Sequence, residues 1–237
     1  MFKSKFMLVV LAFISTLGVH AQVTDEFNLD TGDTAMQIAL QKELIEILVS
    51  DSNEVQAEYK KDSVFYVSDK LDKYKEIFAA ICKSDPLEKC PEVYFTTRKL
   101  SGIASMYPNG VLAINEDIIS RINLSEAIFV LSHEYAHYKF QHSKQRVKII
   151  AKTVADNGLM IREPEQALAS AGFMHQVVDA HHKYEDQADL YGFNYIIKND
   201  IKINCEDMFN KIAGNAIVST DKHKSVADRC KNYKGQL

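Results

Sequence analysis

Tryptophan is absent from the chain, and its 237 residues contain no internal repeat and no low-complexity segment. A basic excess is absent as well, because 28 lysines and arginines face 32 aspartates and glutamates. This mildly acidic balance gives no electrostatic reason to expect nucleic acid or an anionic membrane as a partner. A chain of this length can bury a core as one domain, with room for a small helical appendage.

Long apolar runs are scarce, and the clearest one stands at the N-terminus. Lys3 and Lys5 precede the run Phe6–Gly18, and the residues Val-His-Ala end at Ala21. The run is shorter than the roughly 20 residues that a membrane-spanning helix needs. We therefore predict that residues 1–21 are a Sec signal peptide, that cleavage follows Ala21, and that the mature protein is periplasmic or secreted without a stable membrane span. An N-terminal membrane anchor is the alternative. A lipid anchor is not expected, because there is no cysteine at the boundary.

Four cysteines, an even number, suggest disulfide bonds in an exported protein. Three connectivities are possible. We favour Cys82–Cys90 and Cys205–Cys230, because each of these pairs brackets a local segment. A zinc site made of cysteines is the alternative, but the chain has no C-x-x-C spacing.

Residues 22–90 are predicted to form an N-terminal helical segment. Apolar residues recur at helical spacing in 34–50, and the same register continues through 54–83, where proline and glycine are absent. The pattern predicts two amphipathic helices, the second of them long. No chemistry is evident in this segment, and we expect it either to brace the rest of the chain or to dock a protein partner.

Short β-branched and aromatic stretches follow at 92–97, 102–107 and 111–115. Pro108-Asn109-Gly110 separates the last two and is a strong hairpin signal. The pattern predicts a small antiparallel sheet.

The rest of the chain is predicted to be helical. Asn123 suits an N-cap, and Glu126, three residues later, suits the return partner of a capping box. This helix is expected to run to about Ser143, before a basic stretch. A second long helix is expected from about Glu165 to Lys198, and one or two more in 201–237. The fold class is therefore α+β, mainly helical.

The residues His-Glu-Tyr-Ala-His at 133–137 carry the clearest chemical signal. Positions i and i+4 of a helix share one face, so His133 and His137 can bind the same zinc ion. Glu134 lies about 100° round the helix from His133. It can reach a metal-bound water as a general base without ligating the metal. The alternative is a helix with two structural histidines.

A catalytic zinc needs a third protein ligand. Glu185 and Asp189 share one face of the second long helix, so packing of the two helices can bring Glu185 to the metal. Asp189 would then accept a hydrogen bond from a ligand imidazole and fix its tautomer. The alternative is a solvated acidic face.

These ordered motifs resemble the gluzincin metallopeptidases that include the CAAX prenyl proteases, the HtpX-type proteases and the periplasmic chaperone-proteases. The resemblance covers roughly residues 91–233. It rests on the strand and hairpin, on the H-E-x-x-H helix with His142 five residues beyond, on Glu185-x-x-Ala188-Asp189, and on a final segment with His223 and Arg229 that departs from the Thr-His-Pro … Arg pattern of the family.

The resemblance implies a zincin-like catalytic domain, here residues 91–237, with one Zn²⁺ per chain. It assigns three metal ligands, His133, His137 and Glu185. Glu134 becomes the catalytic base, and Asp189 orients a ligand. His223 becomes a candidate either for stabilising the oxyanion or for supporting a metal ligand, with an ordinary surface histidine as the alternative. We expect His142 to be structural, and His175, His181 and His182 to be non-ligands.

The predicted function is that of an exported zinc metalloendopeptidase acting on extended or unfolded polypeptides. We expect the substrate to add a strand beside 104–106. The alternative is a zinc-binding, chaperone-like module whose site is occluded, with residues 144–165 as a cover. A purely structural helical protein would require both metal motifs to be accidental.

Overall fold

A computed structural model describes residues 35–63, 69–85, 90–97, 103–156, 171–213 and 224–234. The described part is mainly helical and includes one small sheet, which confirms the α+β class. The predicted signal peptide lies outside these residues. Among the described helices, none is both long enough and apolar enough to cross a membrane.

The N-terminal helices are α2 (Ala35–Ser63) and α3 (Asp69–Ser84). Two helices were predicted, but the expected boundary near residues 51–53 is wrong, because α2 continues through it. Ser52 is buried there, and α2 packs along α6 and β1, so tertiary packing outweighs the weak helix propensity of Asp-Ser-Asn. The apolar face of α3 joins the main core through Leu71, Tyr74, Phe78 and Ile81.

The sheet consists of β1 (Glu92–Thr96), β2 (Ala104–Met106) and β3 (Val111–Asn115) in the order β1-β3-β2. The expectation of a purely antiparallel sheet is wrong: β2 and β3 pair antiparallel, but β1 and β3 pair parallel. The hairpin brings β3 back beside β2, and β1 lies on the other side of β3, pointing the same way. Gly110 in the turn has φ 79°, which favours glycine.

The short helix α4 (Glu116–Ile119) leads to α5 (Leu124–Lys139), which begins with the predicted capping box of Asn123 and Glu126. The expected end near Ser143 is wrong. Gln141 adopts a left-handed φ of 55° after Lys139, and a separate helix, α6 (His142–Asp156), starts immediately afterwards. Helix α5 therefore ends two residues after His137, and a new helix begins at His142.

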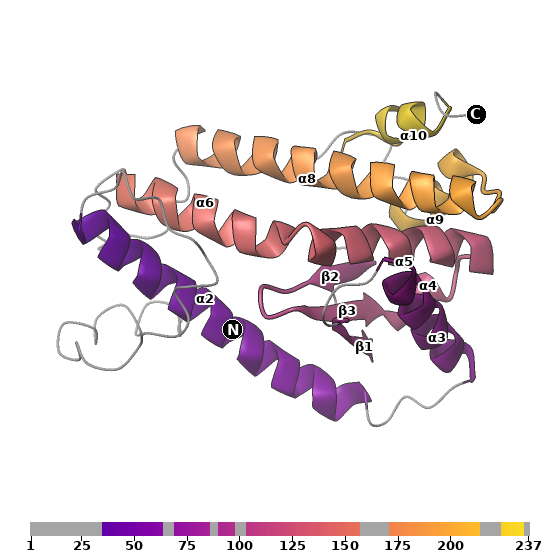
Figure 1. The fold of residues 1–237 in the computed structure, drawn as a ribbon, viewed down its shortest axis with the longest axis horizontal. Coiled ribbons are helices and arrows are strands. Elements are labelled where there is room, and N and C mark those ends of the chain that lie inside the picture. Colours follow the sequence, from indigo (N-terminus) through magenta and orange to yellow (C-terminus); the bar gives the residue numbers. More distant parts are fainter. Residues whose placement is uncertain are drawn as a thin grey trace.

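Three further helices complete the described chain: α8 (Ala171–Lys198), α9 (Cys205–Ala213) and α10 (Val226–Lys234). Helices α5 and α6 lie nearly end to end along α8, which runs in the opposite direction (Figure 1). The two layers approach closely at Gly192, where an added Cβ would lie 3.0 Å from the Phe129 ring. The absence of a side chain at Gly192 therefore allows α8 to pack closely against α5 at Phe129.

Both predicted disulfides are confirmed. Cys82 pairs with Cys90, with 6.1 Å between their Cα atoms. Cys205 pairs with Cys230 at a Cα separation of 5.8 Å and joins α9 to α10.

Candidate metal centre

Helix α5 places the two histidines of the H-E-x-x-H motif on one buried face. The Nε2 atoms of His133 and His137 lie 3.0 Å apart, and the side chains are only 9% and 12% exposed. This is the arrangement expected of residues one helical turn apart. When both rings are neutral, each Nε2 atom can direct a lone pair toward the same metal position.

Helix α8 supplies the carboxylate. Glu185 Oε2 lies 3.4 Å from His133 Nε2, and Glu185 Oε1 lies 3.3 Å from His137 Nε2. Donor atoms bound tetrahedrally to zinc at about 2.0–2.1 Å are separated by about 3.3 Å. The three donors therefore fit zinc in both chemistry and spacing, and the group His133, His137 and Glu185 could hold a metal ion.

Asp189, one turn beyond Glu185, fixes the orientation of His133. Its Oδ1 lies 2.9 Å from His133 Nδ1, so Nδ1 carries the proton and Nε2 is left as the metal-facing lone pair. Burial lowers the pKa of His133, but the hydrogen bonds to Asp189 and Glu185 outweigh it and raise that pKa to about 10. Without a metal, the two carboxylates therefore favour a protonated His133 ring.

A second chain of hydrogen bonds orients His137. Its Nδ1 lies 2.9 Å from Nδ1 of His142, and His142 Nε2 lies 3.1 Å from Gln187 Oε1. The amide oxygen of Gln187 can only accept, so His142 donates through Nε2 and accepts through Nδ1. His137 then donates from Nδ1, and its Nε2 faces the metal position. Burial lowers the pKa of His142 to about 4, which keeps the ring neutral as this arrangement requires.

Aromatic rings hold His142 in place. Its ring stacks on Tyr184, with centroids 4.6 Å apart and planes 16° apart, and it also packs against Phe140. The side chain is 2% exposed. The expectation that His142 is not a ligand is compatible with this position, but the residue also contacts a candidate ligand directly.

His181 lies near Glu185, and Arg146 contacts His181. His181 Nε2 is 3.8 Å from Glu185 Oε1, and Arg146 Nη1 is 3.3 Å from His181 Nδ1. A guanidinium can only donate, so His181 accepts through Nδ1 and presents its N–H toward Glu185. Each of the three candidate ligands therefore has a further polar side chain close to it.

Glu134 follows His133 on α5 and is 6% exposed. No hydrogen bond ties its carboxylate to another side chain in the described part of the chain. It is therefore available to a water molecule placed at the metal centre.

Only part of the final segment of the resemblance is among the described residues. His223 lies outside them. Arg229 is described, and it bonds the carboxylate of Asp189 through Nε and Nη2, both at 2.7 Å. Sequence reasoning quoted Arg229 only through its resemblance to a family segment, and it missed Arg146 and Gln187 altogether. Gln187 fills a variable position of Glu185-x-x-Ala188-Asp189 and Arg146 belongs to no motif; both gain polar partners near the site only because α6 and α8 pack together.

Comparison with known proteins gives one match. The family model described as peptidase family M48 matches residues 80–220, more than half of the chain and a segment that contains all three candidate ligands. No curated protein and no solved structure matches the chain.

Proposed function

Because the chain belongs to the gluzincin metallopeptidases of family M48, we propose that it is an exported zinc-dependent endopeptidase that cleaves extended or unfolded polypeptides. The observation that carries the proposal is the meeting of three buried donor atoms 3.0–3.4 Å apart from two helices. Zincin-like catalysis needs such a three-ligand site with one position left open.

His133, His137 and Glu185 would hold the zinc ion, which when bound supplies Lewis acidity and lowers the pKa of water. Glu134 takes the proton of the attacking water and delivers it to the leaving amine. Asp189 and His142 keep the two imidazoles in the tautomer that binds metal through Nε2.

The free edge of β2 supports an extended substrate. Tyr107 N–H bonds the Val111 carbonyl, and Asn115 N–H bonds the Ile103 carbonyl, so the main-chain polar groups of alternate residues, 103, 105 and 107, are directed at β3. The N–H and C=O of Ala104 therefore point to the outer edge, where the described residues supply no partner. A polypeptide strand can bond there through its main chain alone, with little demand on sequence.

Export is proposed from two observations. The N-terminal sequence has the charged start, short apolar run and small residues of a signal peptide. All four cysteines are paired in two disulfides, which is typical of an oxidising compartment. Two measurements test this part separately. Cell fractionation of a bacterial host that expresses the full-length chain shows whether the protein reaches the periplasm, and N-terminal sequencing shows whether cleavage follows Ala21.

The test of the peptidase proposal compares the purified mature chain with Glu134→Gln and Glu185→Ala, using casein as substrate. We expect Glu134→Gln to keep one zinc per chain and to lose hydrolysis by at least about a hundredfold. Glu185→Ala should lose most of the metal. A chelator should stop the wild type, and added zinc should restore it.

Glu116→Gln is a matched control, because it makes the same change at a half-buried carboxylate outside the metal centre. Equal turnover by wild type and Glu134→Gln would overturn the assignment of the base. A zinc-loaded wild type that leaves casein intact would favour the non-catalytic, chaperone-like module instead.

A further inference from the structure

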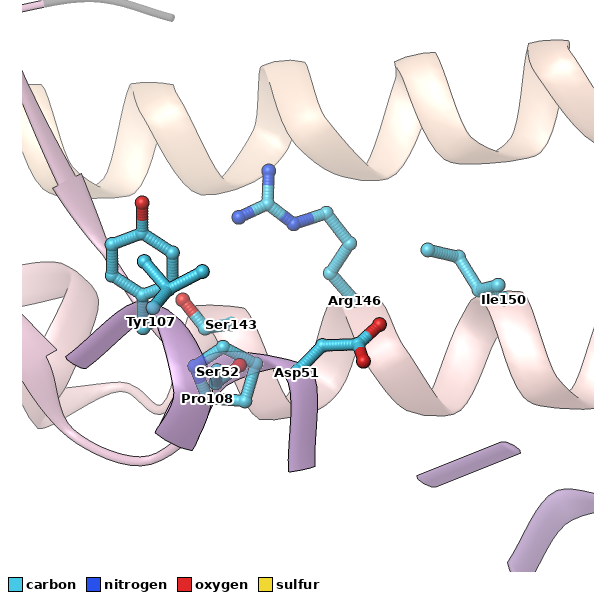
Figure 2. Close-up of a pocket in the computed structure, with 8 residues that line it drawn as sticks. Asp51, Ser52, Tyr107, Pro108, Ser143, Arg146 and Ile150 are labelled. Carbon is cyan, nitrogen blue, oxygen red and sulfur yellow. The ribbon is translucent and has the colours of Figure 1, made fainter. Parts of the chain in front are cut away.

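A small pocket lies beside the metal centre, at the end of β2. Its volume is about 280 Å³, and it is formed by α2, the hairpin turn and α6 (Figure 2). This is below the range of about 300–1,000 Å³ that is common for small-molecule and cofactor sites. The size suits one residue of a polypeptide. Its lining residues are Asp51, Ser52, Val55, Tyr107, Pro108, Ser143, Arg146 and Ile150.

The pocket adjoins the end of the free edge of β2, where an outward main-chain carbonyl is already hydrogen-bonded. The carbonyl of Met106 points outward, but it accepts a hydrogen bond of 2.5 Å from Ser143 Oγ. A strand that pairs with Ala104 therefore cannot continue its pairing past Met106 in this direction. The residue that reaches this closed end meets the pocket, because Ser143 and Tyr107 line it.

Arg146 is the cation of this pocket. Its aliphatic stem rises from α6, and its guanidinium points toward α8 (Figure 2). There it donates to His181, which is a neutral acceptor rather than a counter-ion. In the described part of the chain no carboxylate forms an ion pair with Arg146; Asp51 lines the pocket but does not pair with it. A partly buried guanidinium held by a neutral ring can bind an added anion strongly, because charge-assisted bonds gain strength out of water.

Tyr107 provides a second donor on the same side. Its phenol oxygen also points toward α8 in Figure 2, and it lies 2.8 Å from the hydroxyl of Tyr59. Burial and the bond to Tyr59 raise the pKa of Tyr107, so the group stays a neutral hydroxyl that can donate. The remaining walls are largely apolar, through Val55, Pro108 and Ile150.

We propose that Arg146 and Tyr107 form a carboxylate-binding subsite that receives an anionic group of the polypeptide at the closed end of the β2 edge. The ligand class rests on the proposed function, since a polypeptide must lie along β2. The carboxylate comes either from the C-terminus of the polypeptide or from an aspartate or glutamate side chain. Arg146 thereby determines specificity, while Glu134 and the metal ligands carry out the reaction.

The test measures binding to the zinc-loaded Glu134→Gln variant, so that hydrolysis does not enter. The probes are fluorescein-labelled hexapeptides of alanine and leucine, read by fluorescence anisotropy. One pair differs only in a free C-terminal carboxylate against a carboxamide. A second pair, both with a carboxamide, differs only in a central glutamate against glutamine. We expect the acidic member of one pair to bind about 10-fold or more tightly than its neutral match, and that pair identifies the source.

Arg146→Gln in the same background should abolish this preference and leave the affinity of the neutral peptides unchanged. Arg146→Lys should keep part of it, because lysine retains the charge but not the planar fork. Lys183→Gln is the control: it removes the same charge from an exposed position on α8. Zinc content and thermal midpoint must match the parent in every variant.

Equal binding within both peptide pairs would overturn the subsite, and so would a preference that survives Arg146→Gln. Should Arg146→Gln fail to fold, Tyr107→Phe decides, with an expected loss of about 3-fold or more in the preference. Hydrolysis of casein by the wild type is measured separately. A failure of the peptidase proposal is therefore distinct from a failure of the subsite.

Discussion

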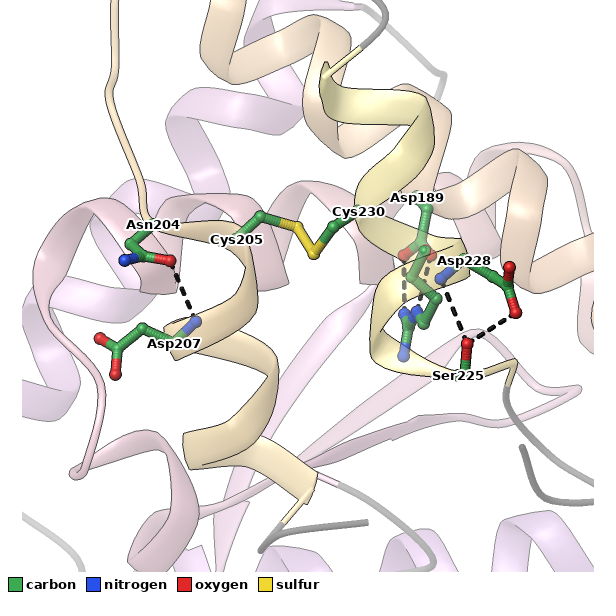
Figure 3. Close-up of a disulfide and its surroundings, with 8 residues drawn as sticks. Asp189, Asn204, Cys205, Asp207, Ser225, Asp228 and Cys230 are labelled. Carbon is green, nitrogen blue, oxygen red and sulfur yellow. Dashed lines mark hydrogen bonds and ion pairs between the residues drawn. A yellow bond between two sulfur atoms is a disulfide. The ribbon is translucent and has the colours of Figure 1, made fainter. Parts of the chain in front are cut away.

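Arg229 holds the carboxylate of Asp189 in a fork of two hydrogen bonds, Nε to Oδ2 and Nη2 to Oδ1, each 2.7 Å long. The same carboxylate bonds His133 Nδ1. Burial would raise the pKa of Asp189, but Arg229 and His133 hold it below its ordinary value. Arg229, on α10, is thus linked to His133 through the carboxylate of Asp189, near the disulfide shown in Figure 3.

Replacing Arg229 with glutamine should weaken zinc binding by about 10- to 100-fold, because Asp189 loses the partner that keeps it charged and oriented. It should also lower the free energy of unfolding by several kcal/mol, on the order of 3–5, since a buried carboxylate is left without its cation. Zinc affinity is measured by competition with a chromophoric chelator. Lys231→Gln, an exposed change on the same helix, should leave both values unchanged. A zinc affinity within twofold of wild type would refute the positioning role.

The Cys205–Cys230 disulfide should contribute to the metal centre as well as to stability. Cys230 follows Arg229 directly, and the bond ties α10 to α9. Replacing both cysteines with serine should cost about 2–4 kcal/mol of unfolding free energy. It should also reduce zinc affinity in the same direction as Arg229→Gln, because α10 is less firmly held.

The other disulfide provides the matched control. Replacing Cys82 and Cys90 with serine should lower stability, but zinc affinity should stay near that of wild type, because no bond runs from either residue to a candidate ligand. Urea unfolding and the chelator competition are run on both double variants. Equal loss of zinc affinity in the two would show that the effect is general destabilisation.

Asp85 should make stability depend on acidic pH. Its carboxylate forms an ion pair with Lys139 of α5 and accepts a hydrogen bond of 3.1 Å from Tyr191 of α8. The bond to Lys139 lowers the pKa of Asp85, outweighing the opposite effect of burial. The stabilisation is therefore complete above the unfolded pKa of about 3.9 and is lost as the pH falls through the lower folded value.

Asp85→Asn should accordingly be less stable than wild type at pH 7, and the difference should narrow as the pH falls below about 4. Urea unfolding at pH 7, 5 and 3.5 measures it. Asp72→Asn is the control, because Asp72 forms an exposed pair with Lys75 and should show a small difference at every pH. A gap for Asp85→Asn that is the same at pH 7 and pH 3.5 would contradict the assignment.

Local signals in the sequence predicted local structure well. The capping box at Asn123 and the hairpin turn before Val111 depend on residues a few positions apart, and both are present. The direction of β1 relative to β3 depends instead on the order of strands in the sheet, which no local pattern encodes. The break at Gln141 was also missed, because glutamine carries no turn signal and adopts the left-handed region only in this context.

The candidate site shows the same division. His133 and His137 follow from helical periodicity, and Glu185 was chosen because a second helix could bring it to them. The residues behind the ligands could not be found in this way. Gln187 and Arg146 are ordinary polar residues on helices, and only the packing of α6 against α8 gives them polar partners near the metal centre.

His142 provides the sharpest test of that outer layer. His142→Phe keeps a ring that can stack on Tyr184 but removes the acceptor for His137 Nδ1–H. Zinc affinity should fall by about 10- to 100-fold, with thermal stability of the metal-free protein nearly unchanged. His142→Gln can offer an amide oxygen to His137 and should recover part of the affinity. Gln187→Leu should give a smaller loss, because His142 then loses the partner that fixes its tautomer. If His142→Phe binds zinc as tightly as wild type, the hydrogen bond does not orient His137; if His142→Gln is no better than His142→Phe, packing rather than the acceptor is what His142 contributes.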